Sequence, residues 1–115
     1  MTRPLVIVEA PYAQNPQAMA LYLRACIQDC LLRGESPIAS VATFCLTGAL
    51  DDLKPEERTE GIAAGLAWYR VAEKAVAYTD HGISAGMMLG MAAAQNAGVV
   101  VEVRELYQTK KDSQP

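Results

Sequence analysis

YTDHGISAGMMLGMAAA, residues 78–94, has the pattern of a buried strand end, a glycine-containing turn and a helix of small residues. The strand is expected to end at Asp80, and Ser84 is the expected N-cap of the helix. Such a turn leaves backbone N–H groups free at the helix start, and small residues let a ligand approach closely. We therefore expect the turn to form part of a ligand site.

Strand and helix patterns alternate along the rest of the chain. Asn15 followed by Pro16 is a typical helix start, and Gly34 is a typical helix stop. The sequence predicts strands over residues 5–10, 36–41, 75–80 and 98–103, helices over 16–33, 55–73 and 85–96, and irregular structure over 43–53. This order predicts an α/β fold: a three-layer, doubly wound parallel sheet of about four to five strands, flavodoxin-like or Rossmann-like.

The composition is that of one globular domain, expected over residues 1–107, with a disordered polar tail over 108–115. A net charge of −3 with scattered basic residues argues against a nucleic-acid-binding surface. The chain begins without a signal-peptide pattern, so we expect a cytoplasmic protein. Cys26 and Cys30, one helical turn apart on an apolar face, are interpreted as buried thiols.

A membrane span is not expected. Residues 82–101 carry no formal charge and are about as long as a membrane crossing. However, Gln95 and Asn96 lie within this stretch, and Gly98 divides it. The stretch therefore indicates a buried helix followed by a buried strand.

Three segments are expected to meet outside the carboxyl ends of the strands, where doubly wound sheets bind ligands: residues 9–13, 39–53 and 80–88. Glu9 is either a carboxylate of the pocket or an edge residue turned to solvent, because it should not be buried without a partner. Asp80 either points into the crevice as an acceptor or only shapes the turn.

The remaining polar residues of these segments have more than one interpretation. Ser84 either contacts a ligand or serves as an N-cap alone, and one residue can do both. His81 is the only histidine and has no evident ligand partner, so no metal site is predicted. The charged residues over 51–58 are interpreted as a solvated run.

The order of segments resembles the nucleoside 2-deoxyribosyltransferase-like superfamily, in particular its small phage and prophage members of unknown function. The resemblance covers residues 5–104. Its landmarks are VIVEAPYAQN after the first strand, TFCLTGALDD, PEERTEGIAAGLAWYRVAEK and YTDHGISAGMMLGMAAAQNAGVVVEV. The resemblance implies a deoxyribosyltransferase-like fold, and cleavage or transfer of the N-glycosidic bond of deoxynucleosides or nucleotides.

The resemblance also implies residue roles. Pro11 and Tyr12 match the loop that flanks base and sugar, and Met88 stands where the family carries its catalytic glutamate. That carboxylate attacks the anomeric carbon or stabilises an oxocarbenium-like charge, which a thioether cannot do. The expected catalytic candidates are Glu9 and Asp80. The expected ligand contacts are Pro11, Tyr12, Asp80, Gly82, Ser84, Gly86 and Met88.

We therefore expect a nucleotide- or nucleoside-binding protein, of phage origin and in the cytoplasm of the bacterial host, that lacks the standard nucleophile and acts by sequestration or sensing. One alternative is an active N-glycosidase or deoxyribosyltransferase that uses Glu9 or Asp80. A second alternative is a protein-interaction module that acts on a host protein. No cofactor, nucleic acid or membrane partner is expected. Because relatives complete their pockets across subunits and the helix near Met88 is rich in apolar residues, we expect a homo-oligomer.

Overall fold

The structure, a computed structural model, describes residues 2–107 and has the predicted alternation of strands and helices. Four strands, four helices of various types and one 3₁₀ turn follow one another along these residues. They are β1 (Leu5–Glu9), α1 (Pro16–Leu32), β2 (Ser36–Ile38), the π-helix η1 (Val41–Leu46), α2 (Pro55–Ala67), the 3₁₀ turn η2 (Trp68–Arg70), β3 (Lys74–Tyr78), α3 (Ala85–Asn96) and β4 (Val100–Arg104).

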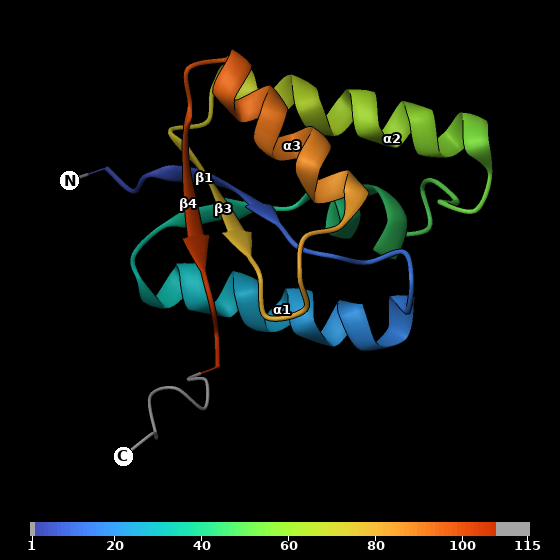
Figure 1. The fold of residues 1–115 in the computed structure, drawn as a ribbon, viewed down its shortest axis with the longest axis horizontal. Helices are drawn as coiled ribbons and strands as arrows, with labels where there is room; N and C mark the ends of the chain where they lie inside the picture. Colours follow the sequence, from blue (N-terminus) through green and yellow to red (C-terminus); the bar gives the residue numbers. More distant parts are fainter. Residues whose placement is uncertain (1, 108–115) are drawn as a thin grey trace.

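The four strands form one parallel sheet in the order β2-β1-β3-β4, and Figure 1 shows α1 on one face with α2 and α3 on the other. The predicted three-layer α/β fold is confirmed. The chain leaves β1 toward α1 and leaves β3 toward α3, so the two neighbouring central strands send their connections to opposite faces. A crevice therefore opens between the carboxyl ends of β1 and β3.

The side chains of β1 alternate between the two faces, as the period of a strand requires. Val6 and Val8 pack against α1, where the predicted buried thiols Cys26 and Cys30 are fully buried. Ile7 belongs to the core under α2 and α3, and Glu9, two residues further along, faces the same side. The strand thus places one carboxylate at the end of an otherwise apolar row.

The structure differs from the prediction between residues 39 and 73. The segment predicted to be irregular contains η1, which packs closely on α2 because Gly65 has no side chain. A Cβ at position 65 would lie 2.8 Å from that of Ser40. The predicted helix over 55–73 ends at Ala67, since Glu73 instead pairs with Leu5 at the start of β1 through its backbone N–H and its carboxylate.

The polar tail and a membrane span were also considered in the sequence. The tail expected to be disordered, 108–115, lies outside the described residues. Among residues 2–107, no helix has both the length and the apolar character that a membrane crossing requires.

Candidate functional site

A cavity of about 560 Å³ opens at the carboxyl ends of β1 and β2 and extends to the turn that follows β3, so it is lined by residues from all three segments that were expected to converge. The fourth wall is α2, which was not expected there. Cavities of this volume suit ligands of the size of a nucleoside or a small cofactor. The lining includes Pro11 and Tyr12 of the first loop, Phe44 and Cys45 of η1, and Ser84 and Gly86 of the β3–α3 turn.

Glu9 is the most deeply placed charged side chain of the cavity. Its carboxylate lies against the bare backbone of Gly90 on α3, so closely that a Cβ at that position would overlap it. The hydroxyl of Tyr69, from the 3₁₀ turn after α2, donates a hydrogen bond of 2.5 Å to Glu9 Oε2. Within residues 2–107 the other oxygen, Oε1, accepts no hydrogen bond from the protein. The site therefore holds a carboxylate with one oxygen still available.

Burial governs the acid–base state of this pair. Removal from water raises the pKa of Glu9 to about 7, although the hydrogen bond from Tyr69 opposes the rise. Burial, together with the nearby Glu9, also raises the pKa of Tyr69, so its hydroxyl keeps the proton that it donates. Near neutral pH Glu9 is therefore divided between its two protonation states, a property shared with many acid–base groups in active sites.

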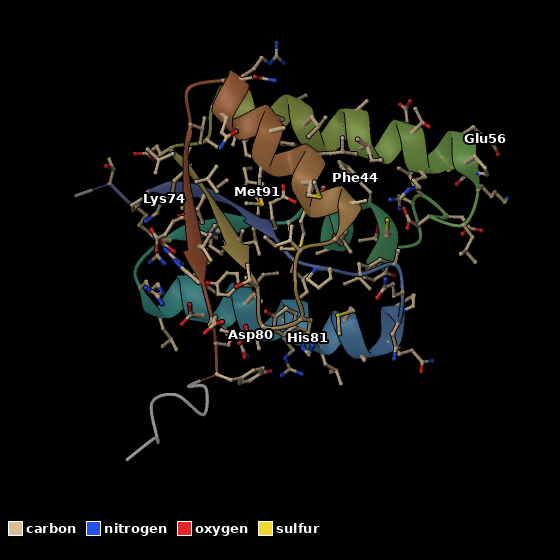
Figure 2. All side chains as sticks on the ribbon, in the orientation of Figure 1. Phe44, Glu56, Lys74, Asp80, His81 and Met91 are labelled. Atoms are coloured by element: carbon tan, nitrogen blue, oxygen red, sulfur yellow. The ribbon has the colours of Figure 1, made fainter. Side chains whose placement is uncertain are left out.

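Asp80, the second predicted catalytic residue, is outside the cavity lining. Its carboxylate accepts hydrogen bonds from the hydroxyl of Tyr22 at 2.5 Å and from the backbone N–H groups of Leu106 and Tyr107. Burial opposes ionisation, but the donors from Leu106 and Tyr22 prevail and its pKa lies below the ordinary value. Asp80 therefore connects the β3–α3 turn to α1 and to the segment after β4 through these hydrogen bonds. Figure 2 shows Asp80 beside α1.

The turn after Asp80 does reach the cavity. His81, Ser84 and Gly86 line it, whereas Gly82, with a φ of 85°, shapes the turn without lining the cavity. The hydroxyl of Ser84 accepts from the backbone N–H of Met87, which makes this serine an N-cap that also faces the cavity.

Met88 lies on the outer side of α3. Its side chain is 62% exposed and does not line the cavity, whereas Met87 and Gly90 are buried and do. The side of α3 that faces the cavity is thus the one that carries residues 87 and 90. Met88 therefore lies outside this cavity, and its expected contact with a ligand stays a prediction.

Several residues of the site were missed at the level of sequence. Tyr69 and Gly90 fall within the stretches predicted to be helical, and nothing in the sequence marked either as a neighbour of Glu9. Asp52 and Arg58, taken for part of a solvated run, line the cavity and form an ion pair of 2.9 Å. A helical projection of α2 places Arg58 on the same side as Gly61 and Gly65, which also line the cavity, so this signal was present in the sequence. The contact of Glu9 with Gly90 joins residues that are distant in the sequence, so no pattern of neighbouring residues could predict it.

The described residues contain no cluster of three or more His, Cys, Asp and Glu side chains suited to a metal ion. The cavity offers donors that include N–H groups at the start of α3, and acceptors that include the carboxylates of Glu9, Asp52 and Glu57. Such an arrangement suits an organic ligand with both kinds of group.

Residues 4–104 match a domain of unknown function, DUF7768. The chain belongs to this family. The match spans β1 to β4 and so includes every wall of the cavity. No curated protein matches the chain. The family description assigns no activity, and the expected homo-oligomer stays a prediction.

Proposed function

We propose that this protein binds a nucleoside- or nucleotide-sized molecule in the cavity at the ends of β1 and β2, with Glu9 as the principal polar contact. The observation that carries the proposal is the half-buried carboxylate of Glu9, which lines the cavity and has one oxygen bonded to Tyr69 and the other without a protein donor among residues 2–107. Burying a carboxylate is unfavourable unless it is compensated, and a ligand that donates to it supplies the compensation.

The surroundings support a ligand of this kind. The cavity lies where the connections of two central strands diverge, which is where doubly wound sheets usually bind nucleotides. The start of α3 presents the backbone of Ala85 and Gly86 to the cavity, and small side chains there permit close approach. The resemblance to deoxyribosyltransferase-like proteins, which rests on the sequence, is consistent with the same ligand class.

A calorimetric titration tests the proposal. The protein is titrated at pH 7 with common ribo- and deoxyribonucleosides and with their monophosphates. At least one member is expected to bind, and Glu9→Gln is expected to weaken its binding about tenfold or more. Glu56→Gln, a change on the exposed start of α2 outside the cavity, is the matched control and leaves the affinity unchanged. Absence of binding by the whole panel at millimolar concentration would refute the proposal.

A second candidate function is hydrolysis or transfer of an N-glycosidic bond. The specific observation in its favour is a carboxylate with a pKa of about 7 in a largely apolar cavity, since such a group can serve as nucleophile or as general acid and base. Glu9 is a better candidate than Asp80, because both oxygens of Asp80 are already bonded to Tyr22 and to backbone N–H groups.

Incubation with 2′-deoxynucleosides, followed by chromatography for the free base, tests this activity. Wild-type protein is expected to release base, and Glu9→Gln is expected to lower the rate at least about a hundredfold. Asp80→Asn is the comparison: a larger loss of activity for this variant, with its fold and ligand affinity intact, would move the reaction away from Glu9.

A further inference from the structure

We propose that the inner end of the cavity recognises an amino-bearing edge of a ring, such as the amino group of an aminopurine, which donates to the free oxygen of Glu9. The proposal rests on the proposed function and states which part of the ligand lies innermost. It follows from the hydrogen-bonding capacity of Glu9, from the groups around it and from the charges along the cavity.

The first argument concerns the donors and acceptors at the inner end. Glu9 Oε2 is occupied by the hydroxyl of Tyr69, at 2.5 Å. An ionised carboxylate can only accept hydrogen bonds, so Oε1 is satisfied only by a donor from the ligand or by water. The nearest wall, the backbone of Gly90 in the middle of α3, cannot supply one because its N–H lies within the hydrogen-bonded helix. A ligand that displaces water from this oxygen must therefore bring an N–H or O–H group.

The second argument concerns shape. Apart from the Tyr69 hydroxyl, the lining near Glu9 is apolar or without a side chain: Gly90 lies against its carboxylate, Ile7 shares its strand face, and Met87 lines the same cavity. Ile7 and Met87 are both buried. A flat ring with apolar faces and a polar edge matches such a surrounding, whereas a sugar would place several hydroxyl groups against carbon.

The third argument concerns charge. Of the described residues, three carboxylates line the cavity, those of Glu9, Asp52 and Glu57, against a single guanidinium. That guanidinium, Arg58, is bonded through one nitrogen to both oxygens of Asp52, at 2.9 and 3.1 Å. A phosphate group would therefore meet unfavourable charge beside Glu9, while an uncharged ring with an amino group would not. The inner end thus takes the ring, and a phosphate, where present, lies elsewhere.

A pair of probes that differ in one amino group tests the inference: adenosine and purine riboside, which lacks the 6-amino group. Both are titrated calorimetrically at pH 8, above the pKa of about 7 that burial gives Glu9, so that the carboxylate is ionised. Adenosine is expected to bind about 10- to 100-fold more tightly, the effect of one hydrogen bond to a charged acceptor.

Two variants then assign the preference to Glu9. Glu9→Gln removes the charge, and Gly90→Ala displaces the carboxylate without altering it, so each is expected to reduce the preference for adenosine to less than about threefold. Gln95→Ala is the matched control on the same helix, because Gln95 is exposed and lies outside the cavity lining, and it keeps the preference. Circular dichroism verifies folding, and either of the first two variants suffices if the other does not fold.

The outcomes separate the two proposals. Equal affinity of the wild-type protein for adenosine and purine riboside overturns the inference but leaves the proposed function in place. A preference that survives in Glu9→Gln also overturns it. If neither probe binds while another nucleoside does, the amino-edge inference is overturned for purines and the proposed function stands; if the whole nucleoside panel fails, both are overturned.

Discussion

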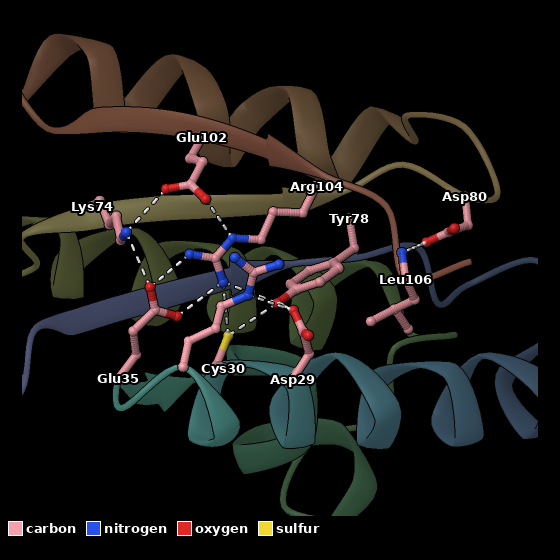
Figure 3. A network of polar contacts seen from close by, with 10 residues as sticks. Asp29, Cys30, Glu35, Lys74, Tyr78, Asp80, Glu102, Arg104 and Leu106 are labelled. Atoms are coloured by element: carbon pink, nitrogen blue, oxygen red, sulfur yellow. Dashed lines mark hydrogen bonds and ion pairs between the residues drawn. The ribbon is translucent and has the colours of Figure 1, made fainter. Parts of the chain in front are cut away.

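Two glutamates on opposite faces of the same sheet, the half-buried Glu9 and the fully buried Glu35, have opposite acid–base properties. Glu9 faces α2 and α3 with a single hydroxyl partner, and burial raises its pKa to about 7. Glu35 lies on the α1 side, where Arg104 donates to both of its oxygens at 2.9 and 2.6 Å and Lys74 lies 3.0 Å away. These hydrogen bonds outweigh burial and lower the pKa of Glu35 to about 2 (Figure 3).

The comparison shows that burial alone does not decide the state of a carboxylate. Glu35 is 4% exposed and remains ionised, because the network around Arg104 also includes Tyr78 and Glu102 and compensates for lost hydration. Among residues 2–107, Glu9 has no cationic partner, and it is correspondingly easy to protonate. Glu35 links the start of β2 to β3 and β4 through its ion pairs with Lys74 and Arg104. Glu9 has no such ion pair among the described residues and keeps one oxygen for a donor in the cavity.

Removing Arg104, the main partner of Glu35, should have the largest effect on stability. Arg104→Met is expected to lower the free energy of unfolding by about 3–5 kcal/mol, because it leaves Glu35 buried with only Lys74. Urea denaturation at pH 7 measures the loss. The double variant Glu35→Leu, Arg104→Met should regain most of it, since no uncompensated charge remains. A loss below about 1 kcal/mol for the single variant would mean that the network contributes little.

Removing the unpaired carboxylate should have an effect that depends on pH. The folded-state pKa of Glu9 lies above its ordinary value of 4.5, so the folded chain binds a proton that the unfolded chain has released between about pH 4.5 and 7. Wild-type stability therefore falls as the pH rises through this window.

Glu9→Gln does not titrate and should escape this loss. Relative to the wild type, its free energy of unfolding is expected to increase by about 3 kcal/mol between pH 4 and pH 8. Denaturation curves at several pH values provide the measurement. The paired glutamate has the opposite sign, because stability due to Glu35 is lost as the pH falls from about 4.5 toward 2. A difference between Glu9→Gln and wild type that stays constant with pH would contradict the assignment.

The close contact of Glu9 with α3 predicts a third effect. Gly90→Ala is expected to destabilise the protein by about 1–3 kcal/mol, because its Cβ overlaps the Glu9 carboxylate and forces a local shift. Gly86→Ala, four residues earlier, where a Cβ makes only an ordinary contact with Ser84 Oγ at 3.9 Å, should be neutral or stabilise the helix by up to about 1 kcal/mol. Thermal denaturation of the pair measures both, and equal behaviour of the two variants would argue against the contact.

The smallest effect is expected from the single hydroxyl that supports Glu9. Tyr69→Phe removes the donor at 2.5 Å, which costs about 1 kcal/mol and raises the pKa of Glu9 above about 7. Carbon-detected NMR of the side-chain carboxyl group follows this titration directly. A lower pKa in the variant would show that water enters and solvates the carboxylate in place of the hydroxyl.

Much of the scaffold could be predicted from local patterns. The alternation of aliphatic runs and capped helices indicated the parallel α/β sheet, and the ends of the strands indicated where the cavity opens. Glu9 was singled out because an acid within LVIVEA demands an explanation. The roles of Met88 and Asp80 could not be derived in the same way. A one-residue difference decides which side of α3 a side chain faces, and the bonds of Asp80 to Leu106 and Tyr107 span more than 20 residues.

The sequence by itself determined the order of elements, the glycine-containing turn and the candidate carboxylate, because capping, strand propensity and hydrophobic period are properties of neighbouring residues. Only the tertiary structure decided what each carboxylate does. The hydroxyl that meets Glu9 comes from 60 residues away, and the guanidinium that meets Glu35 comes from 69 residues away. Protonation depends on desolvation and on such distant partners, so it is a property of the packed molecule rather than of the chain.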